Sequence, residues 1–331
     1  MRRPDDVRSV RAFAPGGIGN LGPGLDILGC AVTGPGDAVT ASLIDDPGVR
    51  VDEPGHPDLP REPERHAAAI AALEVLRRAD ARNAGVALRV EKGLPLSGGQ
   101  GGSSASAVAG AVAVNALLGA PLDQRQLLLA ALAAEERVAG RHLDNLAPAM
   151  LGGIVLIRST DPPDVVRIPA PAALRVVLVH PSQQLRTAEA RAVLPPTIDR
   201  ASAFSQAADV AAMVAAFHTG DFALLRRALN DRIAEPARAP LLPGFIEAKQ
   251  AALEAGAFGC SISGAGPTAF AFTDSDALAE RVAEAMQAAY ASRGLSSNAR
   301  IARIDEQGAR VESPAAEGRP ARLEGAPSAR R

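Results

Sequence analysis

The sequence predicts an α+β fold with two domains. Its 331 residues are 47% hydrophobic, which is enough for a large core, and the length favours two domains. Val-rich strand patterns and helical patterns are mixed along the chain, without the regular alternation of a doubly wound parallel sheet. A Pro-rich, polar stretch at 159–172 separates two halves. We therefore expect an N-terminal domain at 1–160 and a C-terminal domain at 161–312.

The N-terminal half begins with two Val-rich strand patterns, and the segment between them has too much glycine and proline for regular structure. A later helix is expected to start at Asp123, because Gln126 follows three residues on as in a capping box. The predicted elements of this half are strands at 7–14, 37–44, 86–93 and after Gly153, and helices at 63–80, from the glycine loop to about Leu118, and at 123–138.

The C-terminal half repeats the mixture. Thr187 is expected to cap a short helix. The predicted elements are strands at 174–180 and 299–304, helices at 187–193, 201–218, 221–234, 243–255 and 276–293, and a strand–turn–strand unit over 257–274. Residues 313–331 have no apolar periodicity, so a disordered tail is expected there.

Composition argues against several classes of function. The net charge is −2, there is no Trp, and aromatic residues make up 3%, so neither a basic nucleic-acid surface nor a base-stacking surface is expected. No apolar run reaches membrane-spanning length, and the N-terminus lacks the apolar core of a signal peptide. The two cysteines, Cys30 and Cys260, have neither metal nor disulfide spacing, which favours a cytoplasmic protein.

Residues 95–106, PLSGGQGGSSAS, are the strongest functional signal. A glycine-rich loop that leads into a helix can bind a phosphate, because its backbone approaches closely and the first N–H groups of the helix lack partners. A flexible loop with a serine cap is the alternative. The chain has only two lysines, Lys92 and Lys249, and neither follows the loop as a Walker motif requires. The protein-kinase motifs are also absent.

Three other segments carry candidate functional residues. SGAGPT at 263–268 is either a segment whose backbone lies close against a ligand or a tight hairpin. EERVAGRHLDN at 135–145 offers carboxylates suited to Mg²⁺ beside phosphate, or is an exposed helix end. Arg191 and Arg238 could each bind a carboxylate through two hydrogen bonds, or each could be an ordinary surface arginine.

Taken together, the motifs resemble the GHMP family of small-molecule kinases. APGGIGNLGPGLDILG, PLSGGQGGSSAS and ISGAGPTAFAF occur in the family's order. Within the family, HLDNLAPAMLGG, RTAEARAVLP and AEPARAPLLPGF are similar to segments of the homoserine kinases. The resemblance covers about residues 9–312.

The resemblance implies an N-terminal α/β domain of the ribosomal-protein type and a ferredoxin-like C-terminal domain. It implies phosphorylation of L-homoserine by ATP with Mg²⁺, giving O-phospho-L-homoserine for threonine biosynthesis. Because the family is often dimeric, a homodimer is one expectation. No nucleic acid or membrane partner is implied.

Site residues follow from the same motifs. The ATP-binding loop would comprise Pro95, Ser97, Gly98, Gly99, Gly101, Gly102, Ser103 and Ser104. Glu135 and Ser103 would hold the metal. The amino-acid pocket would comprise Asn20, Asp26, His142, Arg191, Arg238, Gly264 and Gly266. This set suits a substrate with an ammonium for Asp26 and a carboxylate for arginine.

The family's catalytic aspartate maps onto Asp144 or Asn145. If it maps onto Asn145, the reaction would proceed without a protein base, by proximity and transition-state stabilisation.

The chain departs from the family pattern at three places. Gln100 stands where the usual loop has Leu, and Gly102 stands at the first Ser, so the metal-binding serine is either Ser103 or lost. The first motif lacks its usual hydroxyl pair. The segment after Glu135 is one residue shorter, so Glu136 could take its role. Two alternatives therefore stay open, namely a mevalonate-type GHMP kinase and a non-catalytic ligand sensor.

Overall fold

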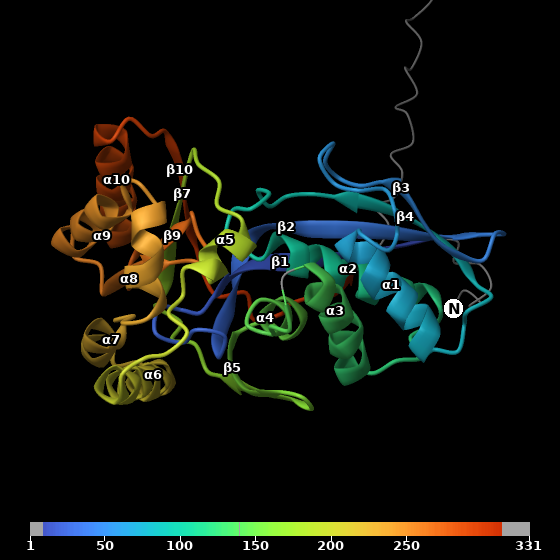
Figure 1. The fold of residues 1–331 in the computed structure, drawn as a ribbon, viewed down its shortest axis with the longest axis horizontal. Helices are drawn as coiled ribbons and strands as arrows, with labels where there is room; N and C mark the ends of the chain where they lie inside the picture. The colour runs from blue at the N-terminus through green and yellow to red at the C-terminus, as the bar shows by residue number, and fades with distance from the viewer. Residues whose placement is uncertain (1–8, 139, 313–331) are drawn as a thin grey trace, which may run out of the picture.

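The computed structural model describes residues 9–138 and 140–312, and the tail expected at 313–331 lies outside the described residues. Two sheets and their helices form two domains (Figure 1). Helices α6 to α10 gather at one end, α1 to α3 lie at the other, and α4 and α5 lie between them (Figure 1). This mixture confirms the α+β class.

The larger sheet has seven strands in the order β11-β1-β2-β4-β3, with the β5–β6 hairpin attached to β2. Its strands are β1 (Ser9–Gly19), β2 (Leu28–Ile44), β3 (Gly48–Glu53), β4 (Gly85–Glu91), β5 (Ile154–Thr160), β6 (Pro163–Ile168) and β11 (Arg310–Glu312). All pairs are antiparallel except β3 with β4.

The expectation of irregular structure between the first two strands is confirmed only for residues 20–27. β1 continues to Gly19 and β2 starts at Leu28, with Gly17 opposite Ala31 after a register shift. A Cβ at Gly17 would lie only 2.5 Å from the carbonyl oxygen of Cys30. The glycines that break the local pattern therefore allow the two strands to approach.

Helices cover the larger sheet as α1 (Ala67–Arg78), α2 (Gly102–Leu117), α3 (Gln124–Val138) and α4 (Leu146–Leu151). α1 begins four residues later than predicted, after a turn in which the N–H of Arg65 donates to the carbonyl of Glu62 (3.0 Å). The predicted capping box is confirmed, because Asp123 and Gln126 accept each other's backbone N–H at 2.8 and 3.0 Å. A Cβ at Gly110 of α2 would lie 2.7 Å from the carbonyl oxygen of Ala68, so this glycine lets α1 and α2 pack closely.

The smaller sheet has the order β10-β7-β9-β8 and is antiparallel throughout. Its strands are β7 (Arg175–Pro181), β8 (Gly259–Ile262), β9 (Ala269–Thr273) and β10 (Ser297–Ala302). Its helices are α5 (Thr187–Ala192), α6 (Arg200–Thr219), α7 (Phe222–Ala228), α8 (Ala234–Arg238), α9 (Phe245–Glu254) and α10 (Asp276–Ser292). If the four strands are numbered by their order along the chain, their order across the sheet is 4-1-3-2. Helices connect the first strand to the second and the third to the fourth, which is the ferredoxin-like arrangement.

Three details of the C-terminal half differ from the predictions. The helix predicted at 221–234 ends at Ala228, and α8 is separate because Asp231 accepts the backbone N–H of Ala234 (3.0 Å) and of Glu235 (2.9 Å). Thr187 is the first residue of α5, and Arg186 occupies the N-cap position. The strand predicted last is followed by β11.

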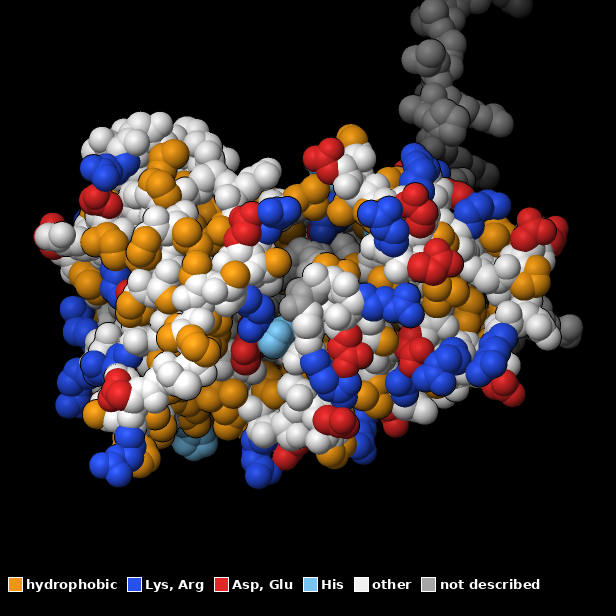
Figure 2. Space-filling model, in the orientation of Figure 1, with side chains coloured by type: hydrophobic (Ala, Val, Ile, Leu, Met, Phe, Trp, Pro, Cys, Tyr) orange, Lys and Arg blue, Asp and Glu red, His pale blue; other side chains and the backbone are white. Residues whose placement is uncertain are grey.

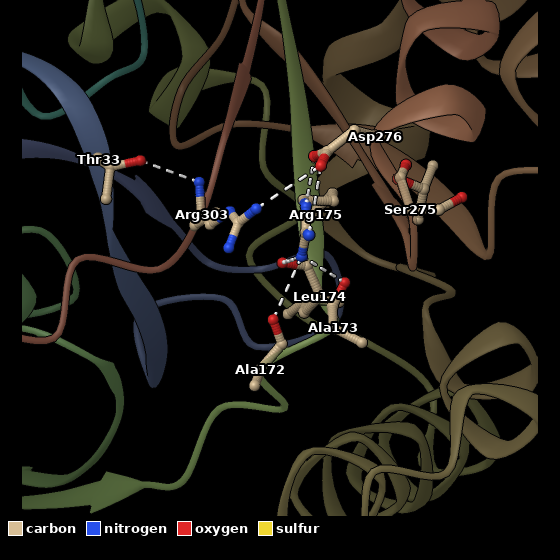
Figure 3. A network of polar contacts seen from close by, with 9 residues as sticks. Thr33, Ala172, Ala173, Leu174, Arg175, Ser275, Asp276 and Arg303 are labelled. Carbon is tan, nitrogen blue, oxygen red and sulfur yellow. Dashed lines mark hydrogen bonds and ion pairs between the residues drawn. The ribbon is translucent and has the colours of Figure 1, made fainter.

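The two halves of the chain are interleaved at their junction. β6 lies beyond residue 160 but pairs with β5, and β11 returns from the C-terminal half to pair with β1. Val32 of β2 forms an isolated bridge with Ile304. Beside it, the N–H of Arg303 donates to the hydroxyl of Thr33 (3.0 Å), and the guanidinium of Arg303 lies near Asp276 (Figure 3). The domain ranges stay a prediction, but the larger sheet takes strands from both sides of residue 160.

Over residues 9–138 and 140–312, no helix combines the length and apolarity that a membrane crossing needs.

Candidate active site

A cleft of about 460 Å³ lies between the two domains. The face shown in Figure 2 is hollowed near its middle, between the two halves of the molecule. Most of the predicted site residues line this cleft, namely Asn20, Pro95, Ser97, Gly98, Gly99, Gly101, Gly102, Ser103, Ser104, Glu135, His142, Asp144, Asn145, Arg191, Arg238 and Gly264. Asp26 and Gly266 are not part of this lining but contact residues that are, Asp26 through Arg191 and Gly266 through the glycine loop.

The glycine loop lies between the two domains and leads into α2. Gly99 and Gly101 have φ of +73° and +70°, which favours glycine. A Cβ at Gly99 would lie 2.5 Å from the carbonyl oxygen of Ser263 and 2.7 Å from that of Gly266, so the third motif packs directly against the loop. Since the first N–H groups of α2 have no partner within the helix, this end of the cleft is suited to an anion.

Glu135 of α3 faces the same loop. Its side chain accepts a hydrogen bond from the hydroxyl of Ser104 (3.1 Å) and is 7% exposed. Burial, and then the charge of Asp144, raises the pKa of Glu135 to about 7. The neighbouring Glu136 is instead exposed and pairs with Arg141. Glu135, and not Glu136, therefore lines the cleft, and Ser104 rather than Ser103 contacts it.

These residues fit a magnesium ion that is shared with phosphates. In the part of the chain that the structure describes, no cluster of three or more His, Cys, Asp or Glu side chains could hold a metal alone. Mg²⁺ commonly takes one or two protein carboxylates and completes its shell with phosphate oxygens and water. A buried carboxylate with a raised pKa, beside a serine hydroxyl and an anion-binding loop, is such a partial site.

Asp26 forms an ion pair across the domains. Arg191 donates to both of its oxygens (2.7 and 3.3 Å), and His142 Nδ1 lies 3.3 Å from Oδ1. Burial opposes ionisation, but hydrogen bonds from His142 and Arg191 outweigh it and hold the pKa of Asp26 well below its usual range. Asn20 accepts the backbone N–H of Asp26 (3.0 Å).

Arg238 is almost fully buried. Its Nε donates to the carbonyl of Ala190 (3.0 Å) and its Nη1 to that of Gly264 (2.9 Å). Burial, and then the charge of Arg191, lowers the pKa of Arg238. Asn20 Nδ2 donates to the same carbonyl of Gly264 (3.0 Å). Segments far apart in the sequence thus converge on one end of the cleft.

Asp144 and Asn145 lie between the two ends. Asn145 Nδ2 donates to Asp144 Oδ2 (3.2 Å), and Asp144 is 3% exposed. Burial, and then the charge of Asp26, raises the pKa of Asp144 to about 6. β1 and β2 pass directly behind this pair, because a Cβ at Gly29 would overlap the carbonyl oxygen of Asp144 and a Cβ at Gly19 would overlap its carboxylate.

Gly29→Ala is expected to destabilise the protein by at least about 2 kcal/mol, because the added Cβ meets backbone that must move. Activity should fall as well, since the displaced residue is Asp144. Chemical denaturation and initial rates measure the two effects. Gly119→Ala is the matched control, because Gly119 has positive φ but open space around it, and should cost only about 1 kcal/mol. Equal losses in the two variants would contradict the close approach.

Part of the site was not predicted from the sequence. Asp58, Leu59, Pro60, Arg65 and His66 line the cleft beyond the loop. Lys92 also lines it; its ammonium pairs with the buried Asp37 and donates to the carbonyl of Gly102 (3.0 Å) and the hydroxyl of Ser106 (3.1 Å). The signal for Lys92 was its rarity and its position just before the loop. Gly102, which replaces the usual serine, leaves room for it, since a Cβ there would lie 3.2 Å from Nζ.

Comparison with known proteins agrees with this geometry. The GHMP kinase N-terminal domain family matches residues 67–153, and the GHMP kinase C-terminal family matches 213–292. A homoserine kinase from Chlorobium phaeobacteroides (strain BS1) is 43% identical over 321 residues, with 92% of this chain and all of that protein covered. One from Arabidopsis thaliana is 46% identical over 314 residues, with 92% and 84% covered. The chain belongs to the homoserine kinases of the GHMP family.

A solved structure supports this membership. The crystal structure of a homoserine kinase from Cytophaga hutchinsonii superposes with a TM-score of 0.90 at 38% identity and covers 94% of this chain and 100% of that one. The two-domain GHMP kinase fold predicted from the sequence is thereby confirmed, and this homoserine kinase homologue is an enzyme of the kinase class. The roles of individual site residues, and the magnesium ion, stay predictions.

Proposed function

We propose that this homoserine kinase transfers the γ-phosphoryl group of ATP to the side-chain hydroxyl of L-homoserine in the cleft between its domains. The observation that carries the proposal is a juxtaposition within one cleft. A glycine loop at a helix N-terminus, suited to phosphates, lies next to paired carboxylates and arginines suited to an amino acid. Phosphoryl transfer depends mainly on such positioning and on charge neutralisation.

The nucleotide would lie along the loop. The backbone N–H groups at the start of α2 would hold its phosphates, and the nucleoside would extend toward Asp58, Leu59 and Arg65, which line that end. Glu135, with Ser104 or Ser103, would hold Mg²⁺. When bound, the ion would neutralise charge on the β- and γ-phosphates.

The amino acid would lie at the other end. Arg238 and Arg191 would bind its carboxylate through their charge and through the guanidinium N–H groups that do not face Ala190, Gly264 or Asp26. Asp26 would bind its ammonium, assisted by the charge of Asp144. Mevalonate has a carboxylate but no ammonium, so it would add negative charge near Asp26 and Asp144 without the positive charge that an amino acid brings. The site therefore favours an amino acid over an isoprenoid alcohol.

The hydroxyl of the substrate would lie near Asp144, between the amino-acid end and the loop. Asp144 is the buried carboxylate there with a pKa close to 6, so it is ionised at neutral pH and can accept the hydroxyl proton. Asn145 holds the Asp144 carboxylate through its amide. The cytoplasmic location expected from the cysteines remains part of the proposal; Cys30 and Cys260 are both buried and free.

ADP formation by the purified protein with ATP and Mg²⁺ tests the proposal. Turnover is expected with L-homoserine, and rates close to background are expected with mevalonate and L-serine. A preference for mevalonate would instead indicate a mevalonate-type kinase of the same family. A protein that binds homoserine without any turnover would instead be a ligand sensor.

A further inference from the structure

The back of the glycine loop carries a buried polar residue that the nucleotide site does not use. Gln100 is 6% exposed and lies between Gly99 and Gly101, at the position where the loop motif usually has Leu. Its side chain does not line the main cleft. A buried amide is costly unless it is hydrogen-bonded, so its partners indicate its role.

Among the described residues, both side-chain partners of Gln100 come from the C-terminal domain. Arg300 of β10 donates from Nη2 to Gln100 Oε1 (2.9 Å), and Gln100 Nε2 donates to the hydroxyl of Thr268 (3.3 Å). That hydroxyl donates in turn to the carbonyl of Gly98 (2.5 Å). His180 of β7 also contacts Thr268, with Nδ1 3.0 Å from Oγ1.

Arg300 is an unusual partner because it has no carboxylate. Within residues 9–138 and 140–312, no Asp or Glu lies within ion-pair distance of its guanidinium, which is held by the carbonyl of Thr33 (2.9 Å) and by Gln100. Burial lowers the pKa of Arg300 to about 10. The buried Gln100 oxygen is therefore poorly satisfied without Arg300, and the half-buried Arg300 loses one of its two acceptors without Gln100.

These contacts act on the peptide groups of the loop. The C=O and N–H of a trans peptide point in opposite directions in one plane. Holding the carbonyl of Gly98 through Thr268 therefore fixes the direction of the next N–H, that of Gly99. Ser263 holds the carbonyl of Gly99 in the same way (2.7 Å). The orientation of the N–H groups decides whether a loop can bind phosphate.

We propose that Gln100, Thr268 and Arg300 form a strap that ties the glycine loop to the C-terminal sheet and positions it for the phosphates of the nucleotide. Gln100 and Arg300 are a coupled pair of positioning residues that do not touch the substrates. This inference rests on the proposed ATP-binding role of the loop.

A double-mutant cycle tests the strap. Gln100→Leu removes the acceptor of Arg300 Nη2 and leaves only the carbonyl of Thr33 for this guanidinium, and Arg300→Leu leaves the Gln100 oxygen without its donor. An unpaired buried polar group favours loop conformations in which water reaches it, and a smaller population of the binding-competent loop weakens the apparent affinity. Each single variant should therefore raise the KM for ATP by about tenfold. The KM for homoserine should stay within about twofold. The double variant, which orphans neither group, should recover most of the loss.

Arg303→Leu is the matched control. Arg303 lies three residues further along the chain, but its guanidinium is exposed and reaches Asp276 rather than the loop (Figure 3). Its KM for ATP should match the wild type. Thr268→Val provides a second variant with nearly unchanged side-chain volume, and it should raise the KM for ATP as Gln100→Leu does. The dissociation constant of ADP, measured by titration calorimetry without homoserine, provides a readout independent of turnover.

The outcomes separate the strap from the proposed function. If the wild type turns over and Gln100→Leu has a normal KM for ATP, the strap is refuted and the function stands. If the double variant loses the sum of the single losses, Gln100 and Arg300 are not coupled. A wild type that binds neither ADP nor ATP would refute the proposed function itself.

Discussion

Glu135→Gln is expected to abolish most of the activity and at the same time to stabilise the protein without ligand at alkaline pH. The activity should fall because Glu135 is the proposed magnesium carboxylate. Charge neutralisation by a metal contributes several kcal/mol to such reactions, which corresponds to a loss of at least about 10²-fold in rate. Initial rates over a range of Mg²⁺ concentrations measure this loss.

The stability effect follows from the sign of the pKa shift. The pKa of Glu135 is raised from 4.5 to about 7 in the folded protein, so the folded state holds this proton more tightly than the unfolded chain. The resulting contribution is complete below pH 4.5 and is lost as the pH rises through 7, and it amounts to roughly 3 kcal/mol. The uncharged amide of the Glu135→Gln variant carries no such penalty. Unfolding in EDTA at pH 5 and pH 8 should therefore show a smaller loss of stability for the variant than for the wild type.

Glu136→Gln is the matched control, because it removes the same charge one residue away at an exposed ion pair. Its activity and its dependence on pH should match the wild type, since exposed ion pairs contribute little. A large loss of activity in Glu136→Gln together with normal activity in Glu135→Gln would instead place the metal at Glu136.

Asp144→Asn is expected to lower kcat by about 10²- to 10⁴-fold, the contribution typical of general-base catalysis. The amide keeps the size of the side chain but cannot accept the proton of the substrate hydroxyl. The KM for ATP should change by less than about threefold, because the loop is untouched. Steady-state kinetics with each substrate varied in turn measures both constants.

A fall of only a few-fold in Asp144→Asn would mean that no protein base acts at this position. The reaction would then depend on proximity and on stabilisation of charge in the transition state. Thermal unfolding of the variant provides the structural control. Removing a buried carboxylate whose pKa is raised should not reduce stability at pH 8, so lost activity together with a lowered Tm would indicate misfolding rather than lost chemistry.

Much of the secondary structure was predictable because its signals are local. The capping box predicts the helix at 123–138, which the structure has at Gln124–Val138, and the strand predicted at 86–93 lies at Gly85–Glu91. The glycine-rich segment at 15–29 belongs to strands at both of its ends, which its pattern does not predict, because glycine leaves no side-chain period and its strand pairing is set by close approach to Ala31 and Asp144. The break after Ala228 was missed because Asp231 caps α8 within an otherwise helical pattern.

Local motifs alone identified the loop, Glu135, the Asp144–Asn145 pair and both arginines as candidates, since each lies in a short segment with distinctive residue types. How these residues are combined depends on contacts between distant parts of the chain. Arg191 pairs with Asp26 across 165 positions, and Lys92 pairs with Asp37 across 55. Residues 58–60, 65 and 66 carry no motif and become part of the cleft only through the fold.

Composition, periodicity and short motifs were sufficient to predict the fold class, the family and the chemical types present at the site. The contact of Ser104 with Glu135, the hydrogen bond between Gln100 and Arg300, and the burial that raises the pKa of Glu135 and Asp144 are visible only in the folded chain. Burial and hydrogen-bond partners depend on distances in space, which a linear pattern does not specify.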